Sequence, residues 1–411
     1  MRSTDTLILG AGQAGLAASR CLTDRGHDHV VLERAQIGQR WRTGVWDSLH
    51  LLTPNWLNAL PGRPYRGPDP DGFAAAGEFA DHLVDYARSS GAPVVEQAPV
   101  KRLDRRGGRF EVTTDAGVWR SGTVIIATGW CDRPAVPALA TGLAAGIHQV
   151  TPDEYRNPGA LPSGGVLVVG ASATGVQIAD ELAAAGREVT IAVGRHTRLP
   201  RTYRGRDIYW WLQRLGHLDK TIDEMPDRAL ARREPSAQLV GRPDRRAVDL
   251  STLQAAGVRL VGRVIAADGF RVRLAPDLAA TMAAAEARLR RLLGRIDEVA
   301  GTHPDVRQRP ATVPHSKSEL DLRTAGITTV VWATGHRRSY PWLTLPGVLD
   351  RHGEIRQHRG HTPLPGLYVL GQRFQHRRGS HLIGGVGRDA AAVADHVTGG
   401  RTGPWIPRTT S

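Results

Sequence analysis

Cysteine is nearly absent from this chain. Only Cys21 and Cys131 occur among its 411 residues, and they form neither C-x-x-C nor C-x4-C. A redox-active pair of thiols within one short loop is therefore excluded. Both cysteines are expected to be structural bystanders, because Cys21 falls in an alanine- and leucine-rich stretch typical of a buried helix face.

Long apolar runs are also lacking. No stretch approaches the roughly 18 apolar residues that span a bilayer, so we expect no membrane partner. A strand pattern begins at Asp5, which leaves no room for a signal peptide. These two features predict a cytoplasmic enzyme.

Lysine is scarce, so arginine supplies nearly all of the formal net charge of +14. The arginines are scattered and form no long basic run, and we expect no nucleic-acid partner. Phosphate-bearing cofactors or an anionic substrate account for the excess more simply. No metal site is expected, since the histidines near the C-terminus lie among arginines and form no H-E-x-x-H pattern: His352, His358, His361, His376 and His381.

The stretch DTLILGAGQAGLAASRCLTDRGHDHVVLERA reads as a strand, a glycine turn, a helix and a second strand. Gly10, Gly12 and Gly15 form G-x-G-x-x-G, which allows a tight turn, close approach of a pyrophosphate and close packing of the helix. The N-terminus of that helix attracts phosphate. Glu33 ends the second strand, where an acid accepts a hydrogen bond from an adenosine ribose. This unit predicts a dinucleotide site.

The stretch GGVLVVGASATGVQIADELAAAGREVTIAVGRH repeats the plan later in the chain. Its glycine turn spans 170–175, with Ser172 in the middle position. The second strand ends at Arg195, followed by Arg198 and Arg201, instead of at an acid. Arginine suits the 2′-phosphate of NADPH, which an acid would repel. The alternative is a solvated arginine in an arginine-rich chain.

Two such units predict two different dinucleotides. We expect FAD to stay bound at the first unit and NADPH to exchange at the second, with hydride passing between their rings where the domains meet. A strand followed by Ala-Thr-Gly is duplicated as well, at 127–129 and 333–335.

Together these motifs resemble the two-dinucleotide-binding flavoproteins, and most closely the class B flavin monooxygenases and their bacterial oxidoreductase relatives. The likeness covers most of residues 5–395. It extends to the segments GQRWR (38–42), WDSLHLLTPNWLNALPG (46–62), PGLYVLG (365–371) and LIGGVGRDAAAVADHV (382–397). They are similar to the family's G-G-x-W segment, flavin-side loop, final strand and flavin-facing helix.

The resemblance implies an α/β fold with two Rossmann-like dinucleotide-binding domains, the NADPH domain being inserted into the FAD domain. The implied boundaries are 1–155 for the first part of the FAD domain, 156–334 for the NADPH domain with a helical insertion around 276–320, and 335–411 for the second part of the FAD domain. The amphipathic helix at 276–300 is either a packing helix or a lid.

The resemblance also implies two sets of site residues. Candidates for tuning the flavin are Asp47, Thr53, Asn55 and Arg337, each of which could instead be a loop cap or a surface charge. The residues implied to bind cofactors are Gly10, Gly12, Ala14, Gly15, Glu33, Arg34, Gln39, Trp41, Thr53, Val100, Ala127, Thr128, Gly129, Gly170, Ser172, Ala173, Thr174, Gly175, Arg195, Arg198, Ala333, Thr334, Gly335, Gly371, Ile383 and Gly384.

The implied reaction is NADPH-dependent monooxygenation, in which dioxygen and a flavin C4a-(hydro)peroxide oxidise a small hydrophobic or aromatic substrate. The family fingerprint F-x-G-x-x-x-H-x-x-x-(Y/F/W) is degenerate here, because Thr151 stands at the histidine position when Tyr155 is placed last. Two alternatives therefore stay open. One is an NADPH:acceptor oxidoreductase that passes electrons to a quinone or flavin without inserting oxygen, and the other is a non-catalytic dinucleotide sensor.

The aromatic segment 203–215 is a candidate substrate face. Tyr203, Tyr209, Trp210 and Trp211 would line a flat apolar pocket with arginines at its rim, or would simply help to close a domain. The sequence leaves open whether the chain forms a homodimer.

Overall fold

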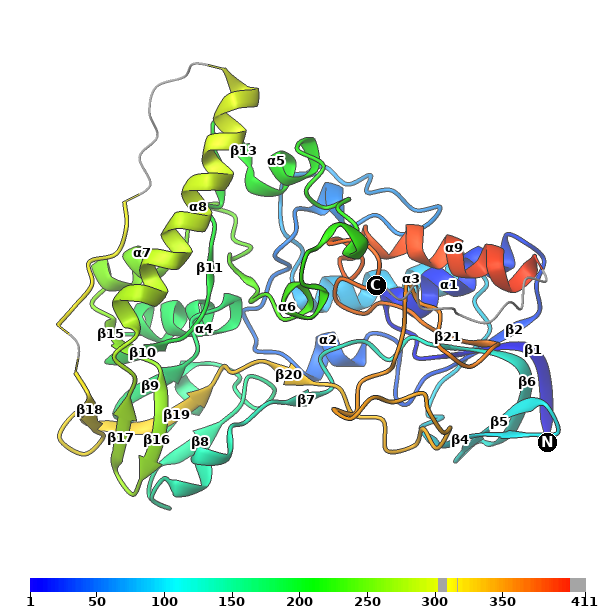
Figure 1. Cartoon of the computed structure of the whole chain (residues 1–411), viewed down its shortest axis with the longest axis horizontal. Coiled ribbons are helices and arrows are strands. Elements are labelled where there is room, and N and C mark those ends of the chain that lie inside the picture. Colours follow the sequence, from blue (N-terminus) through cyan, green and yellow to red (C-terminus); the bar gives the residue numbers. More distant parts are fainter. Residues whose placement is uncertain (302–308, 316, 400–411) are drawn as a thin grey trace.

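Two β-sheets organise the chain, and helices pack against each of them (Figure 1). The computed structural model describes residues 1–301, 309–315 and 317–399. Each sheet contains a strand–turn–helix–strand unit, at the two places where the glycine motifs predict one. The expected α/β class with parallel sheets is confirmed.

The first sheet comprises β1 (Arg2–Leu9), β2 (His29–Leu32), β3 (Val94–Val95), β4 (Val100–Arg106), β5 (Arg109–Thr114), β6 (Gly117–Ile126) and β21 (Leu367–Val369). Its order is β3-β2-β1-β6-β5-β4, and β21 pairs with the second half of β6. The strands β3, β2, β1, β6 and β21 are parallel, whereas β4, β5 and β6 run antiparallel. Strand β21 lies late in the chain, so early and late segments share this sheet.

One face of the first sheet is covered by α1 (Gln13–Thr23), α3 (Ala76–Ser89) and α9 (Val386–Thr398). Ile8 packs on this side with Leu16, Leu83 and Val393. Leu7 points to the opposite face, where it joins apolar side chains of segment 340–355. Burial on both faces explains why β1 ends in the unbroken apolar run Leu7–Leu9.

The second sheet comprises β8 (His148–Val150), β9 (Gly165–Val169), β10 (Val189–Val193), β15 (Arg259–Gly262) and β19 (Ile327–Trp332). The order is β15-β10-β9-β19-β8, and every pairing is parallel. Helices α4 (Ala173–Ala184) and α7 (Leu250–Ala255) cover one face. The other face packs against the hairpin of β16 (Val264–Asp268) and β17 (Arg271–Leu274), to which β18 (Glu319–Asp321) adds.

Two short strands lie between the sheets (Figure 1). Strand β7 (Arg133–Pro134) pairs antiparallel with β20 (His336–Arg337). The chain passes from the first sheet to the second through β7 and returns through β20. Each crossing strand follows one of the duplicated Ala-Thr-Gly segments, so both segments face the junction between the sheets.

Several further elements are short. They are α2 (Gln39–Thr43), α5 (Ile208–Arg214), α6 (Arg228–Arg232), the strands β11 (Thr197–Arg198), β12 (Thr202–Tyr203), β13 (Arg206–Asp207) and β14 (Ala237–Gln238), and the 3-10 helices η1 (Asn55–Leu57), η2 (Ala138–Gly142), η3 (Pro158–Ala160) and η4 (Ile222–Glu224). Strand β11 pairs with β14, and β12 pairs with β13.

The helical insertion expected around 276–320 begins with a long helix. Helix α8 (Leu278–Ala300) ends before Gly301, whose φ of +77° breaks the helical backbone. Among the described residues that follow, 319–321 form strand β18, and residues 302–308 and 316 of the expected insertion lie outside the described part. The domain end expected at 411 also lies outside it, since description stops at residue 399.

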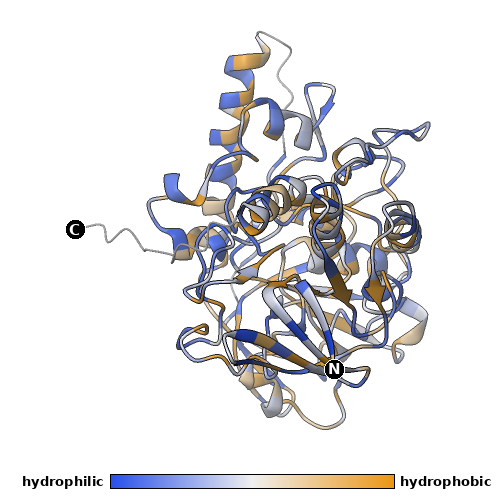
Figure 2. Cartoon of the chain, turned by 90° about the vertical axis from the view of Figure 1, so that its right-hand side faces the viewer, coloured by the Kyte–Doolittle hydropathy of each residue, from blue (hydrophilic) through white to orange (hydrophobic). Residues whose placement is uncertain are grey.

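Helix α8 carries apolar residues on one face and arginines on another, and Figure 2 shows this mixture of hydrophobic and hydrophilic residues along the long helix at the top of the view. Leu289 and Ile296 pack with Trp211 and Leu212 of α5. Within the described ranges, none of the helices is long and apolar enough to span a bilayer.

Candidate cofactor and substrate site

The first glycine turn is shaped by backbone contacts. Gly10 has φ of +104°, and a Cβ there would lie 2.8 Å from the carbonyl oxygen of Ala127. A Cβ on Gly15 would lie 1.8 Å from the carbonyl oxygen of Gly10. Gly12 differs, since its Cβ position has no atom within 4 Å. Gly10 and Gly15 therefore serve the packing of the turn, and Gly12 leaves the N-terminus of α1 open to a ligand.

Glu33 stands beside this turn at the end of β2. Its Oε2 accepts from the backbone N–H of Ala11 at 2.7 Å, and Oε1 accepts from that of Ala35 at 3.1 Å. These two bonds hold the carboxylate at the cavity wall. A carboxylate fixed there can accept from a ribose hydroxyl, as its position after the strand predicts.

The second turn repeats this geometry. Gly170 has φ of +114°, and a Cβ there would lie 2.3 Å from the carbonyl oxygen of Ala333. A Cβ on Gly175 would lie 1.8 Å from the carbonyl oxygen of Gly170. Ser172 begins α4, but its hydroxyl makes no capping hydrogen bond to that helix. The hydroxyl lines the cavity and is available to a ligand.

Three arginines follow β10, at positions 195, 198 and 201, and of these three only Arg195 is exposed. It lines the cavity, and its Nη2 donates to the carbonyl oxygen of Arg233 at 2.7 Å. That single bond leaves most of the guanidinium N–H groups for a phosphate.

Arg198, which is also expected to bind the cofactor, lines the cavity, but protein groups already occupy its guanidinium. Its guanidinium is buried and donates to Asp249 at 2.7 Å, to Glu286 at 2.6 Å and to the carbonyl oxygen of Arg309 at 2.6 Å. Those acceptors fix Arg198 as a buried link between β11, α7 and α8. Arg201 is likewise held, by Asp207 and by the carbonyl oxygen of Leu52.

One continuous cavity of about 2490 Å³ reaches both glycine turns. That volume greatly exceeds the roughly 300–1,000 Å³ of a site for one drug-sized ligand. The expected cofactor residues that line it are Gly10, Gly12, Ala14, Glu33, Arg34, Gln39, Trp41, Thr53, Val100, Ala127, Thr128, Gly129, Gly170, Ser172, Ala173, Thr174, Arg195, Arg198, Ala333, Thr334, Gly335, Gly371 and Ile383.

Three expected cofactor glycines do not line the cavity. They serve packing: Gly15 and Gly175 lie under their turns, and a Cβ on Gly384 would lie 2.0 Å from the carbonyl oxygen of Leu57.

Two of the four expected tuning residues lie away from the cavity. Asn55 is buried in its own loop, where its side chain donates to the carbonyl oxygen of Asp69 and accepts from Ala74 N–H. Asp47 is exposed and accepts from Asn157. Neither residue lines the cavity, and both side chains hold loops, so their role in tuning the flavin stays a prediction.

The other two tuning residues reach the cavity. Thr53 donates its hydroxyl to Asn58 at 2.5 Å, and Arg337 lies in β20 between the sheets. In the aromatic segment, Tyr209 lines the cavity, whereas Tyr203 and Trp211 are buried in packing contacts.

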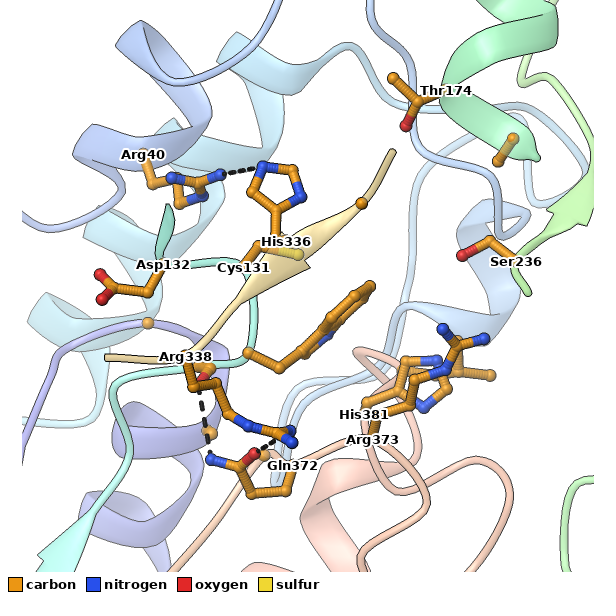
Figure 3. Close-up of a pocket in the computed structure, with 18 of the residues that line it drawn as sticks. Arg40, Cys131, Asp132, Thr174, Ser236, His336, Arg338, Gln372, Arg373 and His381 are labelled. Atoms are coloured by element: carbon orange, nitrogen blue, oxygen red, sulfur yellow. Dashed lines mark hydrogen bonds between the residues drawn. The ribbon is translucent and has the colours of Figure 1, made fainter. Parts of the chain in front are cut away.

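The sequence interpretation missed a cluster at the junction of the two sheets. Asp153 Oδ1 lies 3.2 Å from Arg40 Nη2 and 2.9 Å from His336 Nε2. Figure 3 shows Arg40 directed at His336, 3.2 Å away. Burial opposes the charge on Asp153, but the bonds from His336 and Arg40 hold its pKa below the usual range. The cluster ties α2 to β20 and to the loop that precedes β9.

A second missed group holds the loop after β21. Arg338 donates to the side-chain oxygen of Gln372 at 2.6 Å (Figure 3). It also pairs with Glu354. The amide of Gln372 also donates to Tyr340 Oη at 3.2 Å. Gly371, which begins this loop, stands against Ala14 of α1, since a Cβ on it would lie 2.7 Å from the Ala14 Cβ.

The third missed group lies around Trp130. Arg373 and His381 lie side by side at the cavity wall in Figure 3, and both contact the Trp130 ring. Burial raises the pKa of the neighbouring Cys131 thiol to about 12. The thiol therefore stays protonated at neutral pH, in agreement with a bystander role.

Comparison with known proteins places the chain in a family. The family model described as pyridine nucleotide-disulphide oxidoreductase matches residues 7–290. The chain belongs to this family. A full-length relative, the uncharacterized CzcO-like oxidoreductase of Geobacillus kaustophilus (strain HTA426), is 33% identical over 395 residues, which cover 96% of this chain and 98% of that protein.

Some relatives and structural neighbours are monooxygenases. Indole-3-pyruvate monooxygenase YUCCA6 of Arabidopsis thaliana is 32% identical over 206 residues, about half of each chain (46% and 48%). The flavin-containing monooxygenase from Stenotrophomonas maltophilia has the same fold, with a TM-score of 0.69, 21% identity and coverage of 97% and 99% of the two chains. The resemblance to the class B flavin monooxygenases is thus confirmed.

Family membership identifies the chain as an oxidoreductase, and the family and its neighbours imply a flavin and a nicotinamide nucleotide as cofactors. The disulphide in the family description has no counterpart in a paired dithiol here, since Cys21 and Cys131 are both free.

Proposed function

We propose that this chain is an FAD-dependent, NADPH-consuming monooxygenase that uses dioxygen to oxidise a small hydrophobic or aromatic organic substrate. FAD would lie on segments 1–155 and 335–411, and NADPH on the segment 156–334 inserted between them. The observation that carries this proposal is the single cavity that reaches both glycine turns.

The residues at the first turn fit a bound FAD. The open space at Gly12 admits a pyrophosphate to the N-terminus of α1, and Glu33 would hold the adenosine ribose. The residues at the second turn fit NADPH. Ser172 offers a hydroxyl at the N-terminus of α4, and Arg195 offers free donors for the 2′-phosphate.

Bound flavin supplies two-electron transfer and the activation of dioxygen. The chain itself binds, orients and excludes water. The cluster of Arg40, Asp153 and His336 fixes the angle between the two sheets at the crossing strands. The contacts of Gln372 fix the loop beside the first turn. Since the positions of both ligands depend on these contacts, the polar groups at the junction are positioning residues.

The test begins with purified, FAD-loaded protein under anaerobic conditions. NADPH is expected to bleach the flavin absorbance, and NADH to do so more slowly. In air enriched in ¹⁸O₂, the protein is then incubated with indole-3-pyruvate, cyclohexanone and S-allyl-L-cysteine, the substrates named for YUCCA and for two monooxygenases of the same fold. Incorporation of one ¹⁸O atom into any product supports the proposal.

A second function is favoured by the degenerate fingerprint. Thr151, which takes the histidine position, bonds within its own turn: its N–H and hydroxyl donate to Glu154, and its carbonyl oxygen accepts from the N–H groups of Glu154 and Tyr155. If NADPH bleaches the flavin and a quinone reoxidises it, but no ¹⁸O enters an organic product, the chain is an NADPH:acceptor oxidoreductase. If NADPH does not bleach the flavin, both functions are contradicted.

A further inference from the structure

The wall of the cavity near Trp130 carries an arginine, Arg373, that no acid contacts directly among the described residues. Arg373 lies in the loop between β21 and α9 and lines the cavity. Among the described residues, it makes no hydrogen bond and no ion pair, and its contact is with the Trp130 ring, 5.4 Å from guanidinium carbon to ring centroid. It is half-buried, and burial lowers its pKa. A partly desolvated guanidinium without an anion is unfavourable unless a ligand supplies one.

The arginines beside Arg373 are held differently. Arg338 pairs with Glu354, and Arg378 pairs with Glu234. Glu234 attracts Arg373 at longer range, but its carboxylate is bonded to Arg378. The guanidinium N–H groups of Arg373 therefore stay available to a ligand in the cavity.

The groups around Arg373 are aromatic or uncharged. The Trp130 and His381 rings meet edge to face with centroids 6.0 Å apart. Burial, with the neighbouring Arg373, lowers the pKa of His381 to about 3, so its ring is neutral at physiological pH. Tyr209 of α5 also lines the cavity, close enough to Arg373 for the two groups to interact electrostatically. Flat rings favour a flat apolar ligand.

The phosphate sites of the two dinucleotides lie elsewhere. They are the N-termini of α1 and α4, where open backbone N–H groups meet the cavity at Gly12 and Ser172. Arg373 belongs to neither turn. Its planar fork of donors matches a carboxylate in a bidentate contact.

We propose that Arg373 anchors the carboxylate of an aromatic organic acid whose ring lies against Trp130 and Tyr209. The proposal names the substrate class of the site described above, and so it rests on the proposed function.

The test measures binding to the oxidised, FAD-loaded protein without NADPH. Phenylacetate, indole-3-acetate and 2-naphthoate are each titrated beside the corresponding neutral amide, and binding is followed by flavin difference spectra and by calorimetry. We expect at least one acid to bind ten times or more tighter than its amide. Arg373→Gln should abolish that preference, and Arg373→Lys should restore part of it. Arg88→Gln removes an exposed arginine of α3 that pairs only with Asp85, and it should leave the preference unchanged.

Three results would overturn the proposal: equal affinity for acid and amide in all three pairs, an unchanged preference in Arg373→Gln, or loss of FAD from that variant, which would assign Arg373 to the flavin. Competition by inorganic phosphate as strong as that by the acids would assign it to phosphate. Should the acids bind as expected while NADPH fails to bleach the flavin, the substrate class stands and the proposed reaction fails. If Arg373→Gln does not fold, the affinities for acid and amide are compared in the unmodified protein and in Arg373→Lys. An equal preference for the acid in both proteins would then overturn the proposal.

Discussion

At the scale of single residues, the glycines of the two turns have separate roles. Gly10 and Gly170 require a positive φ, and Gly15 and Gly175 leave no room for a Cβ under the turn. Gly12 has room for a Cβ on the protein side, so the space it leaves open is on the ligand side.

Gly12→Ala should therefore fold normally but lose FAD. We expect a thermal midpoint within a few degrees of the unmodified protein when both are free of flavin, and a dissociation constant for FAD raised at least tenfold. Flavin fluorescence titration measures the affinity. Gly77→Ala, in a helical position that is also open, should change neither quantity by much. Gly15→Ala should instead lower the stability, because its Cβ would meet the oxygen of Gly10.

Arg195 and Arg198 are close in sequence and differ in what they contact. Arg195→Gln should raise the KM for NADPH about tenfold to a hundredfold, since a charge-assisted bond contributes about 1.5–3 kcal/mol, and should leave the KM for NADH nearly unchanged. Steady-state reduction of an artificial acceptor measures both constants. An equal change for the two nucleotides would contradict a 2′-phosphate contact.

At the scale of elements, buried polar contacts join parts of the chain that no short motif connects. Arg198 of β11 binds Asp249, the first residue before α7, and Glu286 of α8. Burial opposes the charge on Asp249, but Arg198 and the α7 N–H groups hold its pKa below the usual range.

Asp249→Asn should keep the cap of α7, because asparagine also accepts from the first N–H groups of a helix. The substitution removes the negative charge that pairs with the buried guanidinium of Arg198, so we expect a loss of about 2–4 kcal/mol in the free energy of unfolding. Urea unfolding followed by circular dichroism measures it. Glu188→Gln, which breaks the exposed pair with Arg259, should cost less than about 1 kcal/mol. Similar losses for the two variants would argue against a structural role for the Asp249–Arg198 pair.

At the scale of the whole molecule, several half-buried histidines are electrically neutral at physiological pH. Burial, with nearby positive groups, lowers the pKa of His217 to about 3 and that of His361 to about 4, and His381 behaves likewise. The unfolded chain takes up protons at these residues below pH 6.5, whereas the folded chain does not.

The stability of the protein should therefore be full above pH 6.5 and fall as the pH drops from 6.5 towards 4. Each histidine contributes up to about 1.4 kcal/mol per pH unit in that window. Urea unfolding between pH 4.5 and 7.5 measures the slope. His361→Asn should reduce the slope, and His148→Asn, an exposed position in β8, should not. An unchanged slope in His361→Asn would contradict the assignment.

Much of the site could be predicted from the sequence because the glycine turns are local. Spacing within about six residues places Gly10, Gly12 and Gly15 between a strand and a helix, and the acid or arginine after the next strand follows from the same unit. The strand–turn–helix–strand units and helix α8 were predicted for the same reason, since local periodicity determines them.

Only the tertiary structure decided which polar side chains are available to a ligand. The guanidinium of Arg198 bonds to Asp249 and Glu286, and the side chain of Asn55 bonds within its own loop, although their sequence positions suggest a role beside a cofactor. Segments far apart in the chain form the cluster of Arg40, Asp153 and His336. The same holds for the contact between Arg373 and Trp130. Residues that meet only through folding have no fixed spacing in the sequence. The sequence by itself therefore determined the two glycine turns, and the packing of the two sheets determined which side chains surround them.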